Sequence, residues 1–189
     1  LKTPDFSLNL LDKLIVLMED ENVDIIICIT KRDLLTSSEL EEIDEELMYY
    51  KKLGYTVIDN TEIQKLKELL NNSYAPYSNF RVSAVVVMKD GTSFNGVNVE
   101  NAAYGSSICA ERSAILAAIS NGYKKNDFDK LYVMCDNEKV GMPCFACRQV
   151  ILELFDKDST ITCMNPYEDE ITLSVKDLCP YPFDSEDLK

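Results

Sequence analysis

Two short cysteine motifs hold the residues of this chain that are best suited to do chemistry. C-x-E at residues 109–111 and P-C-x-x-C at residues 143–147 each open an expected helix. Cys144 and Cys147 are one helical turn apart, so both sulfurs fall on one face. Thiolates at helix N-termini have a lowered pKa, because the helix dipole stabilises their charge, and they suit Zn²⁺. Three protein ligands leave one tetrahedral position open, which is typical of a catalytic zinc site.

Each part of this pattern has a plainer interpretation when it is taken alone. A lone C-x-x-C can be redox-active or merely packed, and a lone Glu111 is usually a solvated helix residue. A four-cysteine structural site would need Cys135 or Cys163, which lie between apolar neighbours and are expected to be core thiols. The combination of both motifs at two helix starts, some thirty residues apart, favours zinc with Glu111 beside it.

The composition narrows the classes of function further. The chain has 189 residues and no histidine, which excludes histidine-based catalysis and histidine metal ligands. Its seven cysteines, an odd number, argue against a disulfide framework. The net charge of −14 disfavours nucleic-acid binding. No apolar run is long enough for a membrane span, and no export signal is present, so we expect a cytoplasmic protein without a membrane partner.

The elements that must position the cysteines form a mixed α/β order. The pattern predicts a helix over 62–70 and strands over 81–88 and 93–99, joined by a turn at Asp90-Gly91. It continues with a helix over 109–120, a strand over 130–135, a helix over 144–155 and a strand over 160–164. This order predicts one mixed sheet with helices packed on it.

The first sixty residues follow a different α-β-α-β pattern. A helix over 7–19 has an apolar stripe formed by Leu8, Leu11, Leu14 and Met18. The apolar run 24–30 suits a strand that is buried on both faces. A helix begins near Ser38, where Ser38 and Glu41 are expected to form a capping box, and a strand covers 55–58. We therefore expect two domains, residues 1–60 and 61–189, of which the first has a thin core.

The two cysteine motifs and the sequence around them resemble the small cytidine deaminase family. The resemblance covers about residues 62–188 and is carried by residues 74–112, by Pro-Cys-x-x-Cys-Arg-Gln at 143–149 and by Asp-Leu-Cys-Pro-Tyr-Pro-Phe at 177–183. The all-cysteine version resembles the homotetrameric branch of that family. It implies a three-layer α-β-α fold around a mixed sheet, and active sites shared between subunits.

The resemblance also implies a role for each matching residue. Cys109, Cys144 and Cys147 would hold zinc, and Glu111 would move protons. The substrate would be bound by Asn98 and Glu100 at its ribose, by Phe80 through stacking, by the Ala110 backbone at the base edge, and by Phe183 of a neighbouring subunit. Arg112 and Gln149 would support the thiolates from outside the ligand set.

The reaction that the resemblance implies is hydrolytic deamination of cytidine or deoxycytidine to uridine or deoxyuridine and ammonia, in pyrimidine salvage. Two residues depart from the family pattern, because Ser83 and Phe145 stand where glycine is usual. Phe145 is expected to cost stability if its φ is positive, or to crowd the mouth of the site. The alternatives are a deaminase of a modified cytosine nucleoside and a non-catalytic zinc-binding or ribosome-binding module.

Residues 3–58 resemble a different family, the circularly permuted ribosome-associated GTPases. Thr30-Lys31-Arg32-Asp33 matches the guanine-specificity motif of that family, with threonine where asparagine is commoner. The chain has no G-x-x-x-x-G-K-S/T phosphate loop, so this partial α/β GTPase-like segment is not expected to bind a nucleotide. Its apolar faces would then need each other or an unidentified partner.

Overall fold

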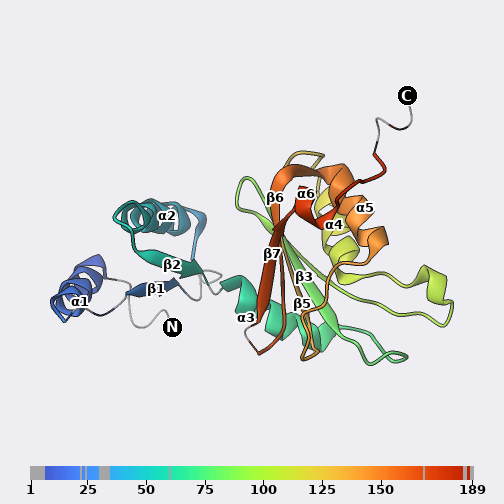
Figure 1. Ribbon diagram of the computed structural model, residues 1–189, viewed down its shortest axis with the longest axis horizontal. Coiled ribbons are helices and arrows are strands. Elements are labelled where there is room, and N and C mark those ends of the chain that lie inside the picture. The colour runs from blue at the N-terminus through green and yellow to red at the C-terminus, as the bar shows by residue number, and fades with distance from the viewer. Residues whose placement is uncertain are drawn as a thin grey trace. The chain divides into compact units, whose positions relative to one another are not determined.

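The computed structural model describes residues 7–21, 23, 25–29, 35–59, 61–167, 169–184 and 187. Contacts between Cα atoms divide the chain into two compact units, Leu1–Thr61 (unit 1) and Glu62–Lys189 (unit 2). Figure 1 draws unit 1 in blue to teal and unit 2 in green to red. Each unit is described by itself.

Unit 2 is built on a five-stranded mixed sheet in the order β4-β3-β5-β6-β7. The strands are β3 (Val82–Met88), β4 (Ser93–Val97), β5 (Phe128–Cys135), β6 (Phe155–Met164) and β7 (Glu170–Ser174). β3 pairs antiparallel with β4 and β5, β5 pairs parallel with β6, and β6 pairs antiparallel with β7. The parallel step requires a crossover, which α5 (Phe145–Leu154) supplies.

Helices cover both faces of this sheet (Figure 1). Successive β3 side chains alternate between the faces, so Ala84 and Val86 pack with α4 (Ala110–Ser120) and α5, whereas Val85 packs with Leu66 and Leu70. Leu66 belongs to α3 (Thr61–Leu69), and Leu70 to the 3₁₀ turn Leu70–Asn72. The predicted three-layer α-β-α architecture around a mixed sheet is therefore confirmed.

The sequence prediction missed the last two elements of unit 2. After β6, which begins at Phe155 and not at 160, the chain adds β7 and then α6 (Val175–Leu178). β7 was missed because it is short and its first residues are exposed, so it carries no clear apolar alternation. Val175 and Leu178 are nonetheless fully buried in the main core, which shows that α6 closes the helical layer.

Unit 1 is a two-stranded parallel sheet with two helices. Its elements are α1 (Leu8–Asp20), β1 (Ile26–Ile29), α2 (Ser37–Lys52) and β2 (Thr56–Asp59). Among the side chains that the structure describes, the buried residues of its small core are Ile15, Ile27, Leu47 and Tyr50. Together with its sequence resemblance, this arrangement supports a partial α/β GTPase-like segment.

Two expectations for unit 1 were wrong. Leu14 and Met18 are exposed, and Ile15 takes the central place in the core, because α1 turns the Leu8–Leu11–Ile15 side inward. β1 is not buried on both faces, since Ile27 is buried but Cys28 is exposed. A sheet of two strands with so few covering residues leaves one side of β1 uncovered by the described part of the unit.

The capping box at the start of α2 is formed two residues earlier than predicted. The Thr36 N–H donates to Glu39 Oε2 at 2.7 Å, and the Glu39 N–H donates to Thr36 Oγ1 at 3.4 Å. This reciprocal pair is the capping box, with Thr36 as the N-cap. The side chains of Ser38 and Glu41, and the whole of Thr30-Lys31-Arg32-Asp33, lie outside the described residues.

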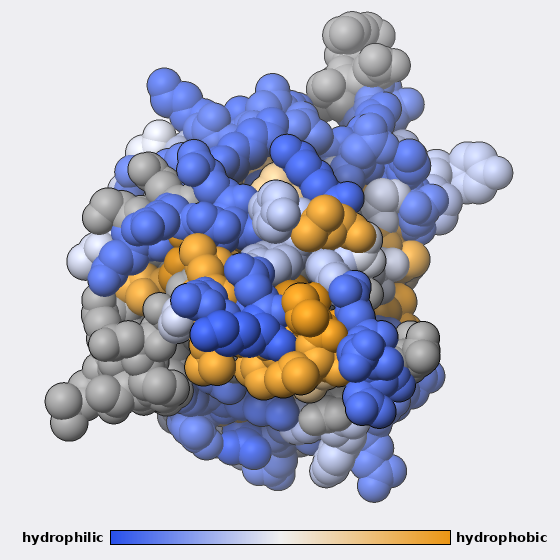
Figure 2. Space-filling model, turned by 90° about the vertical axis from the view of Figure 1, so that its left-hand side faces the viewer, coloured by the Kyte–Doolittle hydropathy of each residue, from blue (hydrophilic) through white to orange (hydrophobic). Residues whose placement is uncertain are grey.

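Apolar side chains remain on the surface of unit 1. Figure 2, which is turned by 90° from the view of Figure 1, shows orange surface that interrupts the blue. The exposed large apolar residues of α1 and α2 include Leu10, Leu14, Leu17 and Met48, and the exposed Leu53 directly follows α2. Among the described residues, no helix combines the length and apolar character that a bilayer crossing requires.

Candidate functional site

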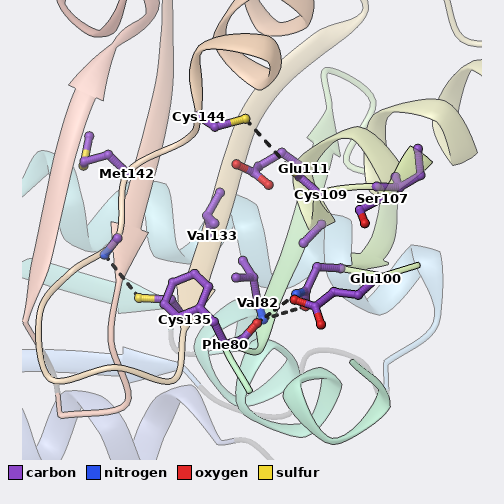
Figure 3. A pocket seen from close by; sticks show the side chains of 14 residues that line it. Phe80, Val82, Glu100, Ser107, Cys109, Glu111, Val133, Cys135, Met142 and Cys144 are labelled. Carbon is purple, nitrogen blue, oxygen red and sulfur yellow. Dashed lines mark hydrogen bonds between the residues drawn. The ribbon is translucent and has the colours of Figure 1, made fainter. Parts of the chain in front are cut away.

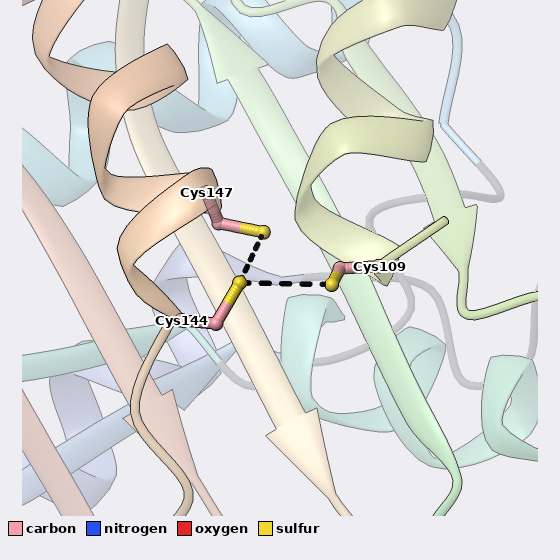
Figure 4. Close-up of side chains that lie close together, drawn as sticks. All are labelled: Cys109, Cys144 and Cys147. Carbon is pink, nitrogen blue, oxygen red and sulfur yellow. Dashed lines mark hydrogen bonds between the residues drawn. The ribbon is translucent and has the colours of Figure 1, made fainter. Parts of the chain in front are cut away.

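Three cysteines meet where two helices of unit 2 begin (Figure 4). Cys109 is the N-cap of α4 and Cys144 is the N-cap of α5, both with extended backbone, and Cys147 follows in the first turn of α5. Neither N-cap side chain donates or accepts a capping hydrogen bond, so both sulfurs are available to a ligand. The prediction that these helices start at the motif cysteines is confirmed.

The spacing of the sulfurs fits a tetrahedral metal ion. Cys109 Sγ and Cys144 Sγ are 3.8 Å apart, Cys144 Sγ and Cys147 Sγ are 3.5 Å apart, and all three lie within 4.8 Å of one another. A zinc ion with Zn–S bonds of about 2.3 Å at tetrahedral angles separates its sulfurs by about 3.8 Å. Thiolate is also a preferred zinc ligand. The donor set therefore fits zinc, with one coordination position left open.

Arg112 lies beside the sulfurs and partly balances their charge. Its Nη2 donates to Cys109 Sγ at 3.6 Å and to the Ser107 carbonyl at 3.2 Å, while its Nε is buried without a partner. Hydrogen bonding from Cys147, Arg112 and Cys144 lowers the pKa of Cys109 to about 5, against the opposing effect of burial. A stabilised thiolate at this position is ready to bind a cation.

Glu111 is a buried carboxyl at the wall of a pocket beside the sulfurs (Figure 3). Only 4% of the residue is exposed, and burial raises the pKa of its carboxyl because a low-dielectric environment disfavours the charge. A carboxyl with a raised pKa, lying next to a metal site, can both accept and donate a proton.

The pocket has a volume of about 220 Å³ and extends from the sulfurs to the ends of β3 and β4. Apolar and polar residues from several elements form its walls. The lining residues are Phe80, Val82, Asn98, Glu100, Ser107, Ile108, Cys109, Ala110, Glu111, Val133, Cys135, Gly141, Met142 and Cys144. A concave, mainly apolar site with a few converging polar groups is typical of small-molecule binding.

Asn98 is fixed in place by three hydrogen bonds at the far end of the pocket. Its Oδ1 accepts from the Val82 N–H at 2.8 Å and from the Ser73 hydroxyl, and its Nδ2 donates to the Phe80 carbonyl at 2.8 Å. Asn98 is largely buried. The side-chain amide is therefore held rigidly, with one N–H of Nδ2 left to donate.

Glu100 is held by the loop that precedes β3. Its Oε2 accepts from the Tyr77 N–H at 2.8 Å and the Ser78 N–H at 3.2 Å, and its Oε1 accepts from the Ser78 hydroxyl. These hydrogen bonds, the one from the Ser78 hydroxyl first, lower the pKa of Glu100. The pocket thus has a neutral donor and an anionic acceptor at the end opposite the sulfurs.

The remaining residues singled out from the sequence lie in two places. Phe80 and Ala110 line the pocket, as do Asn98, Glu100, Cys109, Glu111 and Cys144, whereas Cys147 and Arg112 are not among its lining residues. Phe183 does not line it, and 59% of this residue is exposed. Gln149 Nε2 donates to the Phe183 carbonyl at 2.9 Å, so this side chain contacts the C-terminal segment.

Neither departure from the family pattern obstructs the site. Phe145 is the first residue of α5, has a φ outside the positive range and is 85% exposed, and it does not line the pocket. The expectation that it crowds the mouth of the site is therefore wrong for a single chain. Ser83 is fully buried, and its hydroxyl donates to the Leu66 carbonyl at 2.8 Å, which ties α3 to the sheet.

Arg148 is a residue of the site region that the sequence analysis missed. Its Nε donates to the Pro143 carbonyl at 2.8 Å and its Nη1 to the Leu178 carbonyl at 2.9 Å. It thereby joins the loop before Cys144 to the end of α6. Its position directly after the P-C-x-x-C motif was a signal, but the partner at Leu178 is thirty residues away in the sequence.

Comparison with known proteins identifies the class to which this fold and site belong. The family model "Cytidine and deoxycytidylate deaminase zinc-binding region" matches residues 57–163. The chain belongs to this family of zinc-binding deaminases. Its site therefore binds zinc, and the three-cysteine cluster is the one group of metal-ligating side chains found among the described residues.

Particular relatives agree with this assignment. The chain is 38% identical over 126 residues to a cytidine deaminase of Halalkalibacterium halodurans, which covers 67% of this chain and 94% of the relative. It is 38% identical over 136 residues to a probable cytidine deaminase of Dictyostelium discoideum, and the match covers 69% of this chain and 90% of that relative. The crystal structure of cytidine deaminase from Burkholderia pseudomallei matches with a TM-score of 0.62 and 40% identity, covering 64% of this chain and 95% of that one.

Unit 1 is similar to another family. A model named RsgA GTPase matches residues 1–76. The small ribosomal subunit biogenesis GTPase RsgA of Lactobacillus johnsonii is 41% identical over 59 residues, which make up 31% of this chain and 20% of that protein. The similarity therefore extends over about a fifth of the GTPase.

Proposed function

We propose that this chain catalyses the hydrolytic deamination of cytidine and deoxycytidine to uridine and deoxyuridine, with release of ammonia. One observation carries the proposal: a buried carboxyl, two of the three converging thiols and two fixed polar side chains line the same pocket, and the sulfur of the third thiol, Cys147, lies within 4.8 Å of the other two sulfurs. In a pyrimidine nucleoside, deamination of the base needs the carboxyl and the thiols, and the sugar suits the two polar side chains. The cytidine deaminase relatives support the same substrate.

Cys109, Cys144 and Cys147 are the residues that hold zinc in this proposal. When bound, zinc supplies a Lewis acid that lowers the pKa of a water molecule in the open position. Arg112 donates toward Cys109 and reduces the negative charge of the three thiolates, which otherwise would weaken that effect.

Glu111 moves the protons of the reaction. Its carboxylate accepts a proton from the attacking water and delivers it to the ring nitrogen next to the amino-bearing carbon. It then transfers the second proton of the water to the amino group, which leaves as ammonia. Burial keeps Glu111 away from bulk water and raises the pKa of its carboxyl toward the range in which one group can act as both base and acid.

The sugar and the base are bound by the other pocket residues. The free N–H of Asn98 donates to one ribose oxygen, and Glu100 accepts from a hydroxyl. An anionic Glu100 disfavours a substrate phosphate, so the free nucleoside is preferred over its nucleotide. Phe80 stacks on the base, and the Ala110 backbone meets the base edge.

The loss of cytidine absorbance in the ultraviolet tests this function directly. We expect the zinc-loaded protein to turn over cytidine, and Glu111→Gln to lose at least about a thousandfold in kcat while it keeps zinc, because the amide cannot carry a proton. The exposed residue Glu153 offers a matched control, and Glu153→Gln should leave turnover unchanged. Turnover that survives in Glu111→Gln would contradict the role of this carboxyl.

Assembly and domain organisation form the second part of the proposal. The exposed Phe183 ring is available to complete the pocket of a neighbouring subunit, which supports a homotetramer with shared sites. Gln149 supports this tail through the Phe183 carbonyl. The contact division after Thr61 supports a deaminase domain over 61–189, with 1–60 as a truncated GTPase-like segment that does not bind nucleotide. Pyrimidine salvage and a cytoplasmic location stay predictions.

A further inference from the structure

The contact between β4 and the first turn of α4 has no side chain in it. Gly96 of β4 faces the Ala110 carbonyl and the Ala114 N–H, which are the two groups of one helical hydrogen bond. A Cβ built on Gly96 would lie 2.3 Å from Ala110 O, 2.3 Å from Ala114 N and 3.0 Å from Ala114 Cα. Ordinary Cβ contacts begin at 3.4 Å, and main-chain atoms cannot rotate out of the way.

Small residues surround this contact on both sides. Gly96 pairs with Ala84 of β3, and Ala84, Ala110 and Ala114 have no exposed surface. Because none of these residues carries more than a methyl group, the helix backbone can lie directly on the strand backbone. The distance of α4 from the sheet is therefore set at Gly96.

The same helical turn carries two groups of the site. Cys109 immediately precedes Ala110, and Glu111 immediately follows it. We propose that Gly96 is a positioning residue: the absence of a side chain there places Cys109 and Glu111 at the correct distance from Cys144 and Cys147 on α5. Where it concerns turnover, this inference rests on the proposed function.

A side chain at position 96 would move α4 and leave the rest of the site behind. β4 is held by its pairing with β3 from Ser83↔Val97 to Val87↔Ser93, whereas Cys144 and Cys147 belong to a separate helix. Relief of the clash requires a shift of α4 by about 1 Å, and a misplacement of that size can reduce turnover about a hundredfold. Asn98 and Glu100 follow β4 and would keep their places.

The test compares Gly96→Ala with the unchanged protein after replacement of zinc by Co²⁺. The absorption bands of Co²⁺ report the geometry of its thiolate ligands and do not depend on turnover. We expect Gly96→Ala to bind Co²⁺ with shifted band positions and intensities. With zinc, its kcat for cytidine should fall about a hundredfold while KM changes less than about threefold, because the sugar contacts remain.

Ala118→Val is the matched control, because Ala118 is equally buried but lies two helical turns further along α4. It should lower the melting temperature by overpacking and yet leave the Co²⁺ spectrum and kcat close to those of the unchanged protein. Should it fail to fold, Gly105→Ala replaces it, since nothing lies within 4 Å of a Cβ there. If Gly96→Ala fails to fold, Ala114→Val displaces the same turn and is measured in the same way.

The outcomes separate this inference from the proposed function. An unchanged Co²⁺ spectrum together with unchanged kcat in Gly96→Ala and Ala114→Val would overturn the positioning role. A shifted spectrum in a protein that does not turn over cytidine even before substitution would support the positioning role and contradict the proposed function. A shift that Ala118→Val reproduces in full would show that any strain on α4 has the same effect, which also overturns the inference.

Discussion

Unit 1 and unit 2 differ in how much structure supports their functional residues. In unit 2, a five-stranded sheet has helices on both faces, and fully buried residues such as Leu66, Val85 and Ile151 fill both interlayer cores. In unit 1, two strands and two helices share four buried residues among those whose side chains are described, and Cys28 on β1 is exposed. A site whose sulfurs must stay within a few tenths of an ångström needs the first kind of support. Unit 1 is similar in sequence to part of a GTPase family, but it has no core comparable to that of unit 2 among its described residues.

Zinc removal should have the largest effect and should act on unit 2 alone. A strong chelator is expected to abolish cytidine turnover and to lower the melting temperature of unit 2, because the loss of the ion leaves thiolates close together. The measurement is calorimetry with and without chelator, combined with the ultraviolet assay. An equal shift in the melting temperature of unit 1 on addition of the chelator would contradict this prediction, since none of the described residues of unit 1 belongs to a metal-ligating cluster.

Replacement of Arg112 should have the next largest effect. Arg112→Gln is expected to lower kcat about 10- to 100-fold with zinc still bound, because the charge of the thiolates is then less well balanced. Lys125→Gln, which removes an exposed ion pair with Glu153, is the control and should change little. Steady-state kinetics and metal analysis of both variants test the prediction, and equal kcat values in the two would refute it.

The chemistry of unit 2 could be predicted from the sequence better than its framework. Cysteines at the starts of two helices are a local signal, so Cys109, Cys144 and Cys147 were found without any knowledge of the fold. The contacts of Arg148 with Leu178 and of Ser83 with Leu66 join segments that are far apart in the sequence, so no local sequence pattern predicts them.

The orientation of α1 in unit 1 could not be predicted for a different reason. Leucine, isoleucine, valine and methionine occupy most of its positions between 8 and 18, so the helix is apolar nearly all round. A stripe through Leu14 and one through Ile15 then fit the sequence equally well. Only packing against Ile27, Leu47 and Tyr50 selects the second.

Loss of the Ser78 hydroxyl should have a smaller effect, confined to substrate binding. Ser78→Ala removes one of three donors to Glu100, and a hydrogen bond of about 1 kcal/mol corresponds to roughly a fivefold rise in KM for cytidine, with kcat unchanged. Ser106→Ala removes a hydroxyl that donates to the Ala103 carbonyl outside the pocket and serves as the control. A fall in kcat without a change in KM would argue against a sugar-binding role for Glu100.

Removal of unit 1 should have the smallest effect on catalysis. A protein of residues 60–189 retains α3 and every residue of the two cores of unit 2, so its kcat/KM for cytidine should lie within about threefold of that of the full chain. The comparison uses the ultraviolet assay at equal zinc content. A loss of more than tenfold would show that unit 1 contributes to the site after all.

The hydrogen bonds of Arg148 to the Pro143 and Leu178 carbonyls have a consequence for the order in which the protein matures during translation. The described core residues of unit 1 all precede unit 2 in the chain, so they leave the ribosome before any residue of unit 2 does. The loop before Cys144 depends on a later part of the chain. Arg148, which holds this loop through the Pro143 carbonyl, cannot form its second hydrogen bond until Leu178 has been synthesised. A nascent chain therefore has all of unit 1 outside the ribosome well before it can complete the deaminase site.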